Sequence, residues 1–321
     1  MKQKGRELAL ALVFGLLLPM LMVHGAGNLA GVYVPPAPTD PPGTTGPAGA
    51  PEVRVWMGEE TVTMDLEEYL VGVVLGEMPA SFEPEALKAQ AVVARTYTLR
   101  RHTTAPKHPE GGVCTDPACC QAWRDPSECD SENLEKVRRA VLDTAGLVLT
   151  YEGALIEATY FASSGGRTED AVAVWGSDLP YLQAVDSPEE AYADRYMATV
   201  TMTAAEFSDA LGLTLSGSPG SWVRSVSYTN GGGVETMDIG GHVFRGTELR
   251  SLLGLRSTAF VISASADRVT VTTRGHGHRV GMSQYGAQAM ALEGSTFDEI
   301  LAHYYRGTIL EESIDIVGLL G

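Results

Sequence analysis

The sequence has few basic residues for its length. Its 321 residues include 23 Lys and Arg against 40 Asp and Glu, which gives a formal net charge of −17. No stretch dense in Lys or Arg occurs beyond the first six residues, so we expect no binding to the phosphates of nucleic acids. The charge balance therefore excludes one large class of function.

Several catalytic signatures are also absent. The chain contains no G-x-S-x-G, no H-E-x-x-H and no glycine-rich loop of the phosphate-binding kind. The usual marks of serine hydrolases, zincin-type metalloproteases and nucleotide-binding enzymes are therefore missing. No internal repeat is visible. The function must be carried by other residues.

The N-terminus carries a targeting signal. Lys2, Lys4 and Arg6 precede an uncharged run from Leu8 to Val23. The run is close to the shortest length that spans a bilayer, and the basic flank predicts a cytoplasmic N-terminus. We therefore predict a single-pass anchor in the cell membrane within residues 1–27. A cleaved signal peptide is the alternative, although "VHGAGN" offers no clean cleavage site. Both predict an extracytoplasmic remainder.

The rest of the chain divides by composition. Residues 28–51 are rich in Pro, Gly and Thr, which is typical of a stiff, extended linker. Residues 52–315 have the patterning of an α+β domain with mixed helices and antiparallel strands. Within it, residues 102–135 form a Cys- and His-rich excursion from the pattern. Residues from about 201 to 262 are predicted to form a smaller inserted subdomain.

Local patterns predict individual elements. Alternation in "EVRVWM" and "TVTM" predicts a hairpin, and "LVLTY" with "ALIEATYFASS" predicts two strands joined at Glu152 and Gly153. "DRVTVTT" predicts a further strand. Thr203 and Thr296 are each followed three residues later by Glu, which predicts two helix starts.

One acidic residue lies on an apolar helix face. A helix is predicted from Asp65, an N-cap with Glu68 completing a capping box, as far as Pro79. Glu77 falls on the apolar stripe of this helix, where lost hydration would raise the pKa of its carboxyl and suit it to general acid catalysis. The alternative is a solvent-facing Glu77, or one paired with Arg95 of the next helix.

Two loops carry polar side chains between glycines. In "RGHGHRVGMSQYGA", Gly275, Gly277 and Gly281 allow close backbone approach or positive φ. The hydrogen-bonding side chains of this loop are His276, His278, Ser283, Gln284 and Tyr285. Such a loop suits a polyhydroxylated substrate, although a strand-to-helix corner with a core histidine explains the pattern equally well. "YFASSGGRTED" is a similar loop, with Ser163, Ser164 and Arg167 after a strand.

Four potential metal ligands lie within thirteen residues. His108, Cys114, Cys119 and Cys120 could form a closed tetrahedral zinc site, which would be structural because no position remains for water. One disulfide is the alternative, natural for an exported chain, with Cys129 available as a partner.

Several of these motifs occur together in one family. "EEYLVGVVLGEMPASFEPEALKAQAVVARTYTL", "YFASSGGRTED", "LPYLQAV" and "RGHGHRVGMSQYGAQAMALEG" follow one another in this order. In these motifs the chain resembles the stage II sporulation protein D family of lytic transglycosylases, which is related to the amidase-enhancer proteins. The resemblance spans about residues 52 to 310.

The resemblance implies roles for individual residues. It makes Glu77 the catalytic acid and places the other matching residues in a glycan-binding cleft: Arg95, Ser163, Ser164, Tyr181, His278, Ser283, Gln284 and Tyr285. Some relatives bind zinc with a His/Cys cluster, and here Cys119 replaces a usual histidine. Gln183 stands where a basic residue is common, and Arg279 replaces a glycine.

The resemblance also implies a reaction. Most glycosidases need two carboxylates, but in lytic transglycosylation the muramyl C6 hydroxyl attacks its own C1, so one acid suffices and catalysis needs no cofactor. The expected substrate is peptidoglycan stripped of stem peptides, cleaved between N-acetylmuramic acid and N-acetylglucosamine at the sporulation septum during engulfment. The expected partners are a cell-wall amidase and a membrane scaffold. The rival hypotheses are a non-catalytic glycan-binding enhancer of an amidase, and a zinc hydrolase with an open coordination site.

Overall fold

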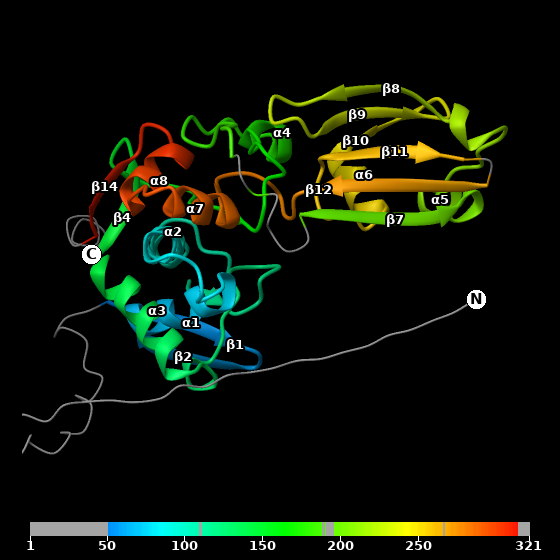
Figure 1. Ribbon diagram of the computed structural model, residues 1–321. Coiled ribbons are helices and arrows are strands. Elements are labelled where there is room, and N and C mark those ends of the chain that lie inside the picture. Colours follow the sequence, from blue (N-terminus) through cyan, green and yellow to red (C-terminus); the bar gives the residue numbers. More distant parts are fainter. Residues whose placement is uncertain (1–50, 109–110, 188–189, 191–195, 266, 314–321) are drawn as a thin grey trace, which may run out of the picture. The chain divides into compact units, whose positions relative to one another are not determined.

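The predicted α+β class is confirmed, although the strands form several small sheets. The computed structural model describes residues 51–313, apart from 109–110, 188–189, 191–195 and 266 (Figure 1). Strand pairs within it are mostly antiparallel, and two short pairs are parallel. Two hydrophobic cores organise these elements.

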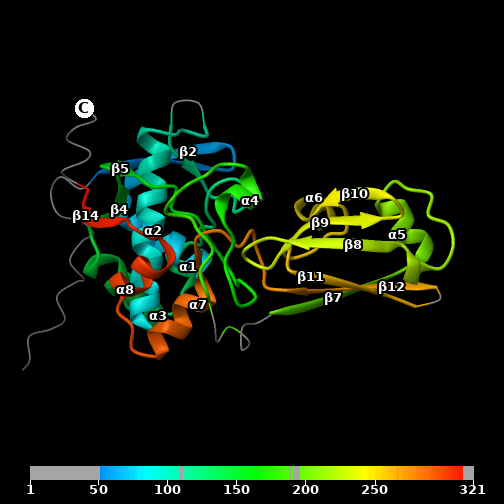
Figure 2. The ribbon, with the colours of Figure 1, turned by 90° about the horizontal axis from the view of Figure 1, so that it is seen from above.

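The first core surrounds one long helix. Helix α2 (Pro84–Thr103) contacts four other helices: α1 (Leu66–Glu77), α3 (Ser131–Asp143), α7 (Gln284–Leu292) and α8 (Phe297–Tyr304) (Figure 2). Small side chains on α2 let these neighbours approach closely. The fully buried alanines are Ala86, Ala89, Ala91 and Ala94.

Two small sheets border this core. The predicted hairpin is present as β1 (Glu52–Met57) and β2 (Glu60–Asp65), and β3 (Val113–Cys114) of the excursion pairs with β1. The second sheet has the order β14–β4–β5. Its strands are β14 (Ile309–Glu312), β4 (Leu147–Tyr151) and β5 (Ala154–Leu155). The excursion is therefore attached to the core through its own short strand.

The strand predicted from "ALIEATYFASS" is interrupted. Its first part, β5, pairs with β4 across the turn at Glu152 and Gly153, which both have positive φ. Its second part, β6 (Tyr160–Phe161), pairs instead with β13 (Met282–Ser283). The two polar loops of the sequence are thereby brought side by side, because β6 leads into one and β13 follows the other.

Helix α1 begins after its cap, Asp65, and ends at Glu77. Asp65 caps α1 by accepting hydrogen bonds from the N–H groups of Glu67 and Glu68, at 2.8 and 3.1 Å. The Glu68 side chain accepts a hydrogen bond from Arg138, so the predicted capping box is not formed. Met78 is extended before Pro79, as expected of a residue preceding proline.

The second core belongs to residues 197–274. It is enclosed by two three-stranded sheets and two helices (Figure 1). The elements are β7 (Met197–Thr203), α5 (Ala204–Ala210), β8 (Val223–Tyr228), β9 (Val234–Ile239), β10 (His242–Arg245), α6 (Gly246–Leu252), β11 (Phe260–Ala264) and β12 (Arg268–Arg274). These strands extend beyond the range of about 201–262 expected for a subdomain, because β7 pairs with β12. Its status as a separate subdomain stays a prediction.

Three short helices complete the description. They are η1 (Pro126–Glu128), α4 (Ala171–Trp175) and η3 (Pro219–Ser221). The helix starts predicted at Thr203 and Thr296 are both confirmed as capping boxes. The anchor predicted within residues 1–27 and nearly all of the linker lie outside the described residues. Within the described ranges, no helix is both long and apolar enough to cross a membrane.

Arg279 is a buried arginine of the second polar loop that forms hydrogen bonds with the first polar loop and with the segment of the second core. Arg279 is 2% exposed and has a φ of 68°, in the left-handed region that favours glycine. Its guanidinium pairs with Glu169 at 3.0 Å and donates to the carbonyls of Ser164 and Gly231, at 2.6 and 2.7 Å. The strained backbone is thus held by a side chain with several buried partners.

Removing this side chain should leave a buried charge unpaired. We expect Arg279→Met to lower the free energy of unfolding by about 3 to 5 kcal/mol. Adding Glu169→Gln to this variant should recover part of the loss, because the uncompensated charge disappears. Urea unfolding measures both. Arg139→Met, at an ion-paired side chain that is 75% exposed, is the control and should change stability by less than about 0.5 kcal/mol. Equal losses of unfolding free energy in the Arg279 and Arg139 variants would contradict a stabilising role of the buried Arg279 side chain.

Candidate active site

A cavity of about 760 Å³ opens beside the end of α1. Its walls come from α2, the excursion, the segment around β6, the chain after α4 and the loop before β13. Its side chains include Glu77, Tyr97, Arg100, Arg101, Lys107, Glu157, Tyr160, Phe161, Trp175 and His278. The volume is that of a typical ligand pocket.

Glu77 has the desolvated environment that the helix pattern indicated. Burial raises the pKa of its carboxyl, while the Ala122 N–H and the nearby side chains of Tyr160 and Gln284 act in the opposite direction. The Ala122 N–H donates to Glu77 Oε1 at 2.6 Å. Among the described residues Glu77 has no cationic partner. The Tyr160 hydroxyl is buried and forms no hydrogen bond with any residue that the structure describes.

Two glycines of α1 bring Ala122 to Glu77. Gly72 and Gly76 are four residues apart and lie on one face of the helix. The excursion crosses this face, where the Arg124 N–H donates to the Gly72 carbonyl at 3.0 Å. A Cβ on Gly76 would lie 2.9 Å from the backbone of Ala122, and one on Gly72 would overlap Trp123 at 2.0 Å. Only glycine allows this approach.

A second carboxylate lines the same cavity. Glu157 pairs with Arg100 at 3.1 Å and also with Arg101, and its N–H donates to the Tyr181 hydroxyl at 3.1 Å. Glu157 could not be predicted as a site residue, because nothing in "ALIEATYF" shows that two arginines of α2 face it. The two carboxylates therefore differ: Glu157 is neutralised by cations, whereas Glu77 is not.

His278 lies in the cavity wall between two aromatic rings. Its ring centroid is 5.5 Å from that of Phe161 and 5.2 Å from that of Trp175. Burial, followed by the charge of Arg250, lowers the pKa of His278 to about 4. Its Nδ1 accepts a hydrogen bond from the Val280 N–H at 3.1 Å, so the ring is neutral and fixed at physiological pH.

The structure places Arg95 away from Glu77. Arg95 is fully buried and pairs with Glu67 at the opposite end of α1, with its Nε 2.9 Å from Glu67 Oε1. It also donates to the carbonyls of Val141 and Leu147. The alternative in which Glu77 pairs with Arg95 is therefore not formed. The side chain instead joins α1, α3 and β4.

The serines of the first polar loop hold a carboxylate. Ser163 and Ser164 are buried, and their hydroxyls donate to Glu190 at 2.8 and 3.0 Å. Glu190 also accepts from Ser187 Oγ at 2.5 Å. The expectation that both serines line the cleft is corrected, since their hydroxyls are engaged internally. Sequence reasoning missed Glu190, which is 26 residues or more from both serines.

The other residues that the resemblance placed in the cleft do not line the cavity. Tyr181 is buried and holds the backbone of Glu157. Ser283 caps α7 through the Gly286 N–H at 3.2 Å. Gln284 is buried near Glu77, and Tyr285 packs edge-on against Phe82 with centroids 5.1 Å apart. Of the residues that the resemblance placed in the cleft, only Glu77 and His278 line the cavity.

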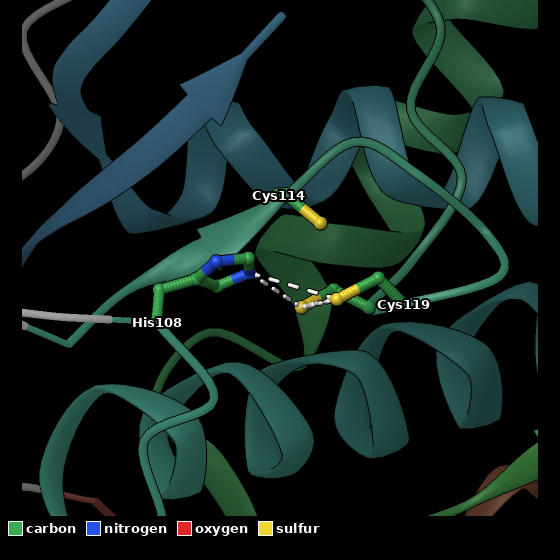
Figure 3. A group of neighbouring side chains, drawn as sticks. His108, Cys114 and Cys119 are labelled. Atoms are coloured by element: carbon green, nitrogen blue, oxygen red, sulfur yellow. Dashed lines mark hydrogen bonds between the residues drawn. The ribbon is translucent and has the colours of Figure 1, made fainter.

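The four predicted metal ligands lie close together, and Figure 3 shows three of them, His108, Cys114 and Cys119. Cys119 and Cys120 also line the cavity. His108 Nε2 lies 3.7 Å from Cys119 Sγ and 3.5 Å from Cys120 Sγ, and the two sulfurs are 3.9 Å apart. Around a tetrahedral zinc ion, bonds of about 2.1 to 2.3 Å place ligand atoms about 3.5 to 3.8 Å apart. The ligand atoms of these residues and Cys114 all lie within 4.8 Å of one another, so the cluster could hold a metal. All four cysteines are free, so the alternative disulfide is not formed.

Comparison with known proteins identifies relatives that match most of the chain. Residues 58–151 match the family model described as "Stage II sporulation protein". The chain is 43% identical to the stage II sporulation protein D of Bacillus subtilis over 83% of its own length and 80% of that protein. It is 41% identical to that of Bacillus amyloliquefaciens, over 77% and 74% of the two chains.

A more distant relative has a different name. The chain is 31% identical to the amidase enhancer of Bacillus subtilis over 75% of its own length, but this match covers only 40% of that longer protein. The similarity to the two sporulation proteins is higher and extends over most of both chains. The chain belongs to the stage II sporulation protein D family.

Proposed function

We propose that the protein is a lytic transglycosylase that cleaves peptidoglycan strands between N-acetylmuramic acid and N-acetylglucosamine. One observation carries the proposal: Glu77 lies in a cavity large enough for sugar rings, with its pKa raised by burial and no cation beside it among the described residues. A raised pKa favours the protonated carboxyl, which is the form that can give a proton to a leaving oxygen.

The reaction needs one acid because the substrate supplies the nucleophile. Protonated Glu77 donates its proton to the glycosidic oxygen, and the bond from this oxygen to the muramyl C1 breaks. The muramyl C6 oxygen bonds to C1, and its proton passes to the Glu77 carboxylate, which restores the acid. The attacking hydroxyl belongs to the same sugar and so acts at a high effective concentration. The products are an N-acetylglucosamine end and a 1,6-anhydro-muramyl end.

The groups around Glu77 stabilise its ionised form between the two proton transfers. The Ala122 N–H is already bonded to the carboxyl, and Tyr160 and Gln284 also favour the charged form. Burial favours the protonated form. Both influences act on the carboxyl, and a group that first donates and then accepts a proton must pass through both forms.

The biological setting follows the named relatives. Since the most similar proteins described above are stage II sporulation proteins D, we place the activity at the sporulation septum, on strands already stripped of stem peptides. An N-terminal anchor would hold the catalytic domain outside the cytoplasmic membrane. A cell-wall amidase would prepare the strands, and a membrane scaffold of the engulfment machinery would hold both proteins.

The cluster of His108, Cys114, Cys119 and Cys120 would hold a structural zinc ion. Four ligands fill a tetrahedral site and leave no position for a reactive water, which argues against a zinc hydrolase. The ion would fix the excursion, whose residues Gln121 and Ala122 follow directly after Cys120. The Gln121 side chain accepts a hydrogen bond from Thr98 of α2 at 2.8 Å, which anchors the same segment from the other side.

A non-catalytic role is the second candidate. The similarity to a protein named amidase enhancer favours a glycan-binding partner of an amidase. Such a protein would use the same cavity without needing an acid. The desolvated state of Glu77 favours the enzyme, because a binding protein gains nothing from a carboxyl held ready to lose its proton.

Replacing the acid separates the two candidates. We expect Glu77→Gln to lower the rate of anhydro-muramyl product formation by about 10²- to 10⁴-fold, with glycan binding retained. Mass spectrometry of products from purified cell-wall glycan measures the first, and co-sedimentation with the glycan the second. Glu68→Gln, on the same helix but bonded to Arg138, is the control and should keep wild-type turnover. Unchanged products with Glu77→Gln would refute the enzymatic function.

The pH dependence should follow the surroundings of Glu77. Activity requires the protonated acid, so it should fall as pH rises through the raised pKa of Glu77. Gln284 lowers this pKa. Gln284→Leu should therefore move the alkaline fall in kcat to higher pH. A series of kcat measurements across pH tests the shift, and an alkaline limb that stays in place would contradict the role of Glu77 as the acid.

Zinc should be bound and should support the active site. We expect about one zinc ion per chain in the purified protein, and a chelator should lower both thermal stability and activity. Cys120→Ser should reduce zinc content, whereas Cys129→Ser, outside the cluster, should not. Metal analysis of both variants checks this. Equal zinc loss in the two variants would contradict the four-residue site.

A further inference from the structure

The cavity wall contains one large aromatic side chain that the mechanism does not use. Trp175 ends α4 and lines the cavity together with Glu77, yet it remains 43% exposed. A tryptophan that packs a core is mostly covered, and exposure of so large an apolar ring inside a concave site indicates a ligand.

We infer that the Trp175 indole is the stacking platform for a sugar ring of the glycan strand beside the bond that Glu77 cleaves. This inference rests on the proposed function and adds a substrate-positioning residue to it. A pyranose ring presents an apolar face of C–H groups, and its polarised hydrogens are attracted to the negative face of an aromatic ring. The indole is the largest such face among the aromatic residues that line this cavity.

The rings behind Trp175 make the platform rigid and neutral. His278 lies 5.2 Å from Trp175 at an interplanar angle of 52°, and Phe161 lies 5.5 Å behind His278 at 62°. Since burial keeps His278 neutral, this wall carries no charge that would draw water onto its surface. The three side chains form one continuous aromatic wall.

The backbone holds Trp175 in place from both sides. The Ala171 N–H at the start of α4 donates to the Leu182 carbonyl at 2.9 Å, and the Asp170 carboxylate accepts from the Ala184 N–H at 2.6 Å. Directly after Trp175, Gly176 has a φ of 76° and ends the helix. A fixed mount of this kind reduces the entropy that binding would otherwise cost.

The remainder of the cavity complements the polar edge of a sugar. Arg100, Arg101 and Lys107 line it together with Glu157. These side chains offer donors and an acceptor for hydroxyl and amide groups, whereas the faces of the aromatic rings are apolar. A ligand with one apolar face and polar edges fits both surfaces, and a fully apolar partner segment does not.

Binding of a peptide-free glycan tetrasaccharide tests the platform. We use Glu77→Gln as the background, so that the ligand is not cleaved, and measure the dissociation constant by calorimetry. Adding Trp175→Ala should weaken binding by about 10- to 30-fold, as expected when a tryptophan covering a ligand is truncated. Trp175→Phe keeps an aromatic face and should stay within about threefold. Leu142→Ala, a truncation of a side chain that is 58% exposed on α3, is the control and should have no effect.

A spectroscopic readout reports on the same contact. The tetrasaccharide should change the tryptophan fluorescence of the Glu77→Gln protein, and Trp175→Phe should remove most of this change although the ligand still binds. If Trp175 had only a structural role, Trp175→Phe would lower the thermal midpoint of the protein, and the ligand would still change the tryptophan fluorescence.

The outcomes distinguish this inference from the proposed function. If Glu77→Gln does not bind the tetrasaccharide and the wild type yields no anhydro products, both fail. If the wild type cleaves and Glu77→Gln binds, but Trp175→Ala binds equally tightly with an unchanged thermal midpoint, the platform alone is refuted.

Discussion

The hydrogen bond from the Ala122 N–H to Glu77 is the contact on which the candidate active site depends. It joins a helix of the first core to the Cys- and His-rich excursion, at 2.6 Å. Without it, the Glu77 carboxyl would be desolvated with little compensation, and its ionised form would be disfavoured further. The contact exists because two glycines leave one face of α1 bare. A feature of backbone packing therefore sets the electrostatics of the acid.

The cavity shows how one fold gives two carboxylates different properties. Glu157 faces two arginines of α2 and is charge-compensated, whereas Glu77 is surrounded by backbone, a tyrosine and an amide. In the proposed reaction Glu77 is therefore the acid, although two carboxylates line the walls. Environment, rather than residue type, assigns the role.

The sequence predicted what depends on near neighbours along the chain. The cap at Asp65, the end of α1 before Pro79 and the apolar surroundings of Glu77 all follow from spacings of a few residues. The ligands of the His/Cys cluster were also predictable, because they lie within thirteen residues. The four motifs, taken in order, also predicted the family to which the similar proteins belong.

What failed depends on pairs far apart along the chain. The resemblance placed Arg95 in the cleft, but its partner Glu67 lies 28 positions away at the other end of α1. The serines of the first loop were expected in the cleft, but they enclose Glu190. Arg279 and Glu169 are 110 positions apart. A buried ion pair leaves no local pattern, so only the folded chain reveals which polar residues face inward.

Cys120 of the His/Cys cluster and Ala122, which donates to Glu77, are close in sequence, and this spacing limits how the excursion can change in length during evolution. Ala122 follows Cys120 by two residues, and two residues span at most about 7 Å. Insertions elsewhere in the excursion would lengthen a surface loop at little cost. A single residue added between Cys120 and Ala122 would carry the donor N–H past Glu77 while the cysteine stayed in place. We therefore expect this spacing to tolerate no change in length, even where the residues that fill it differ.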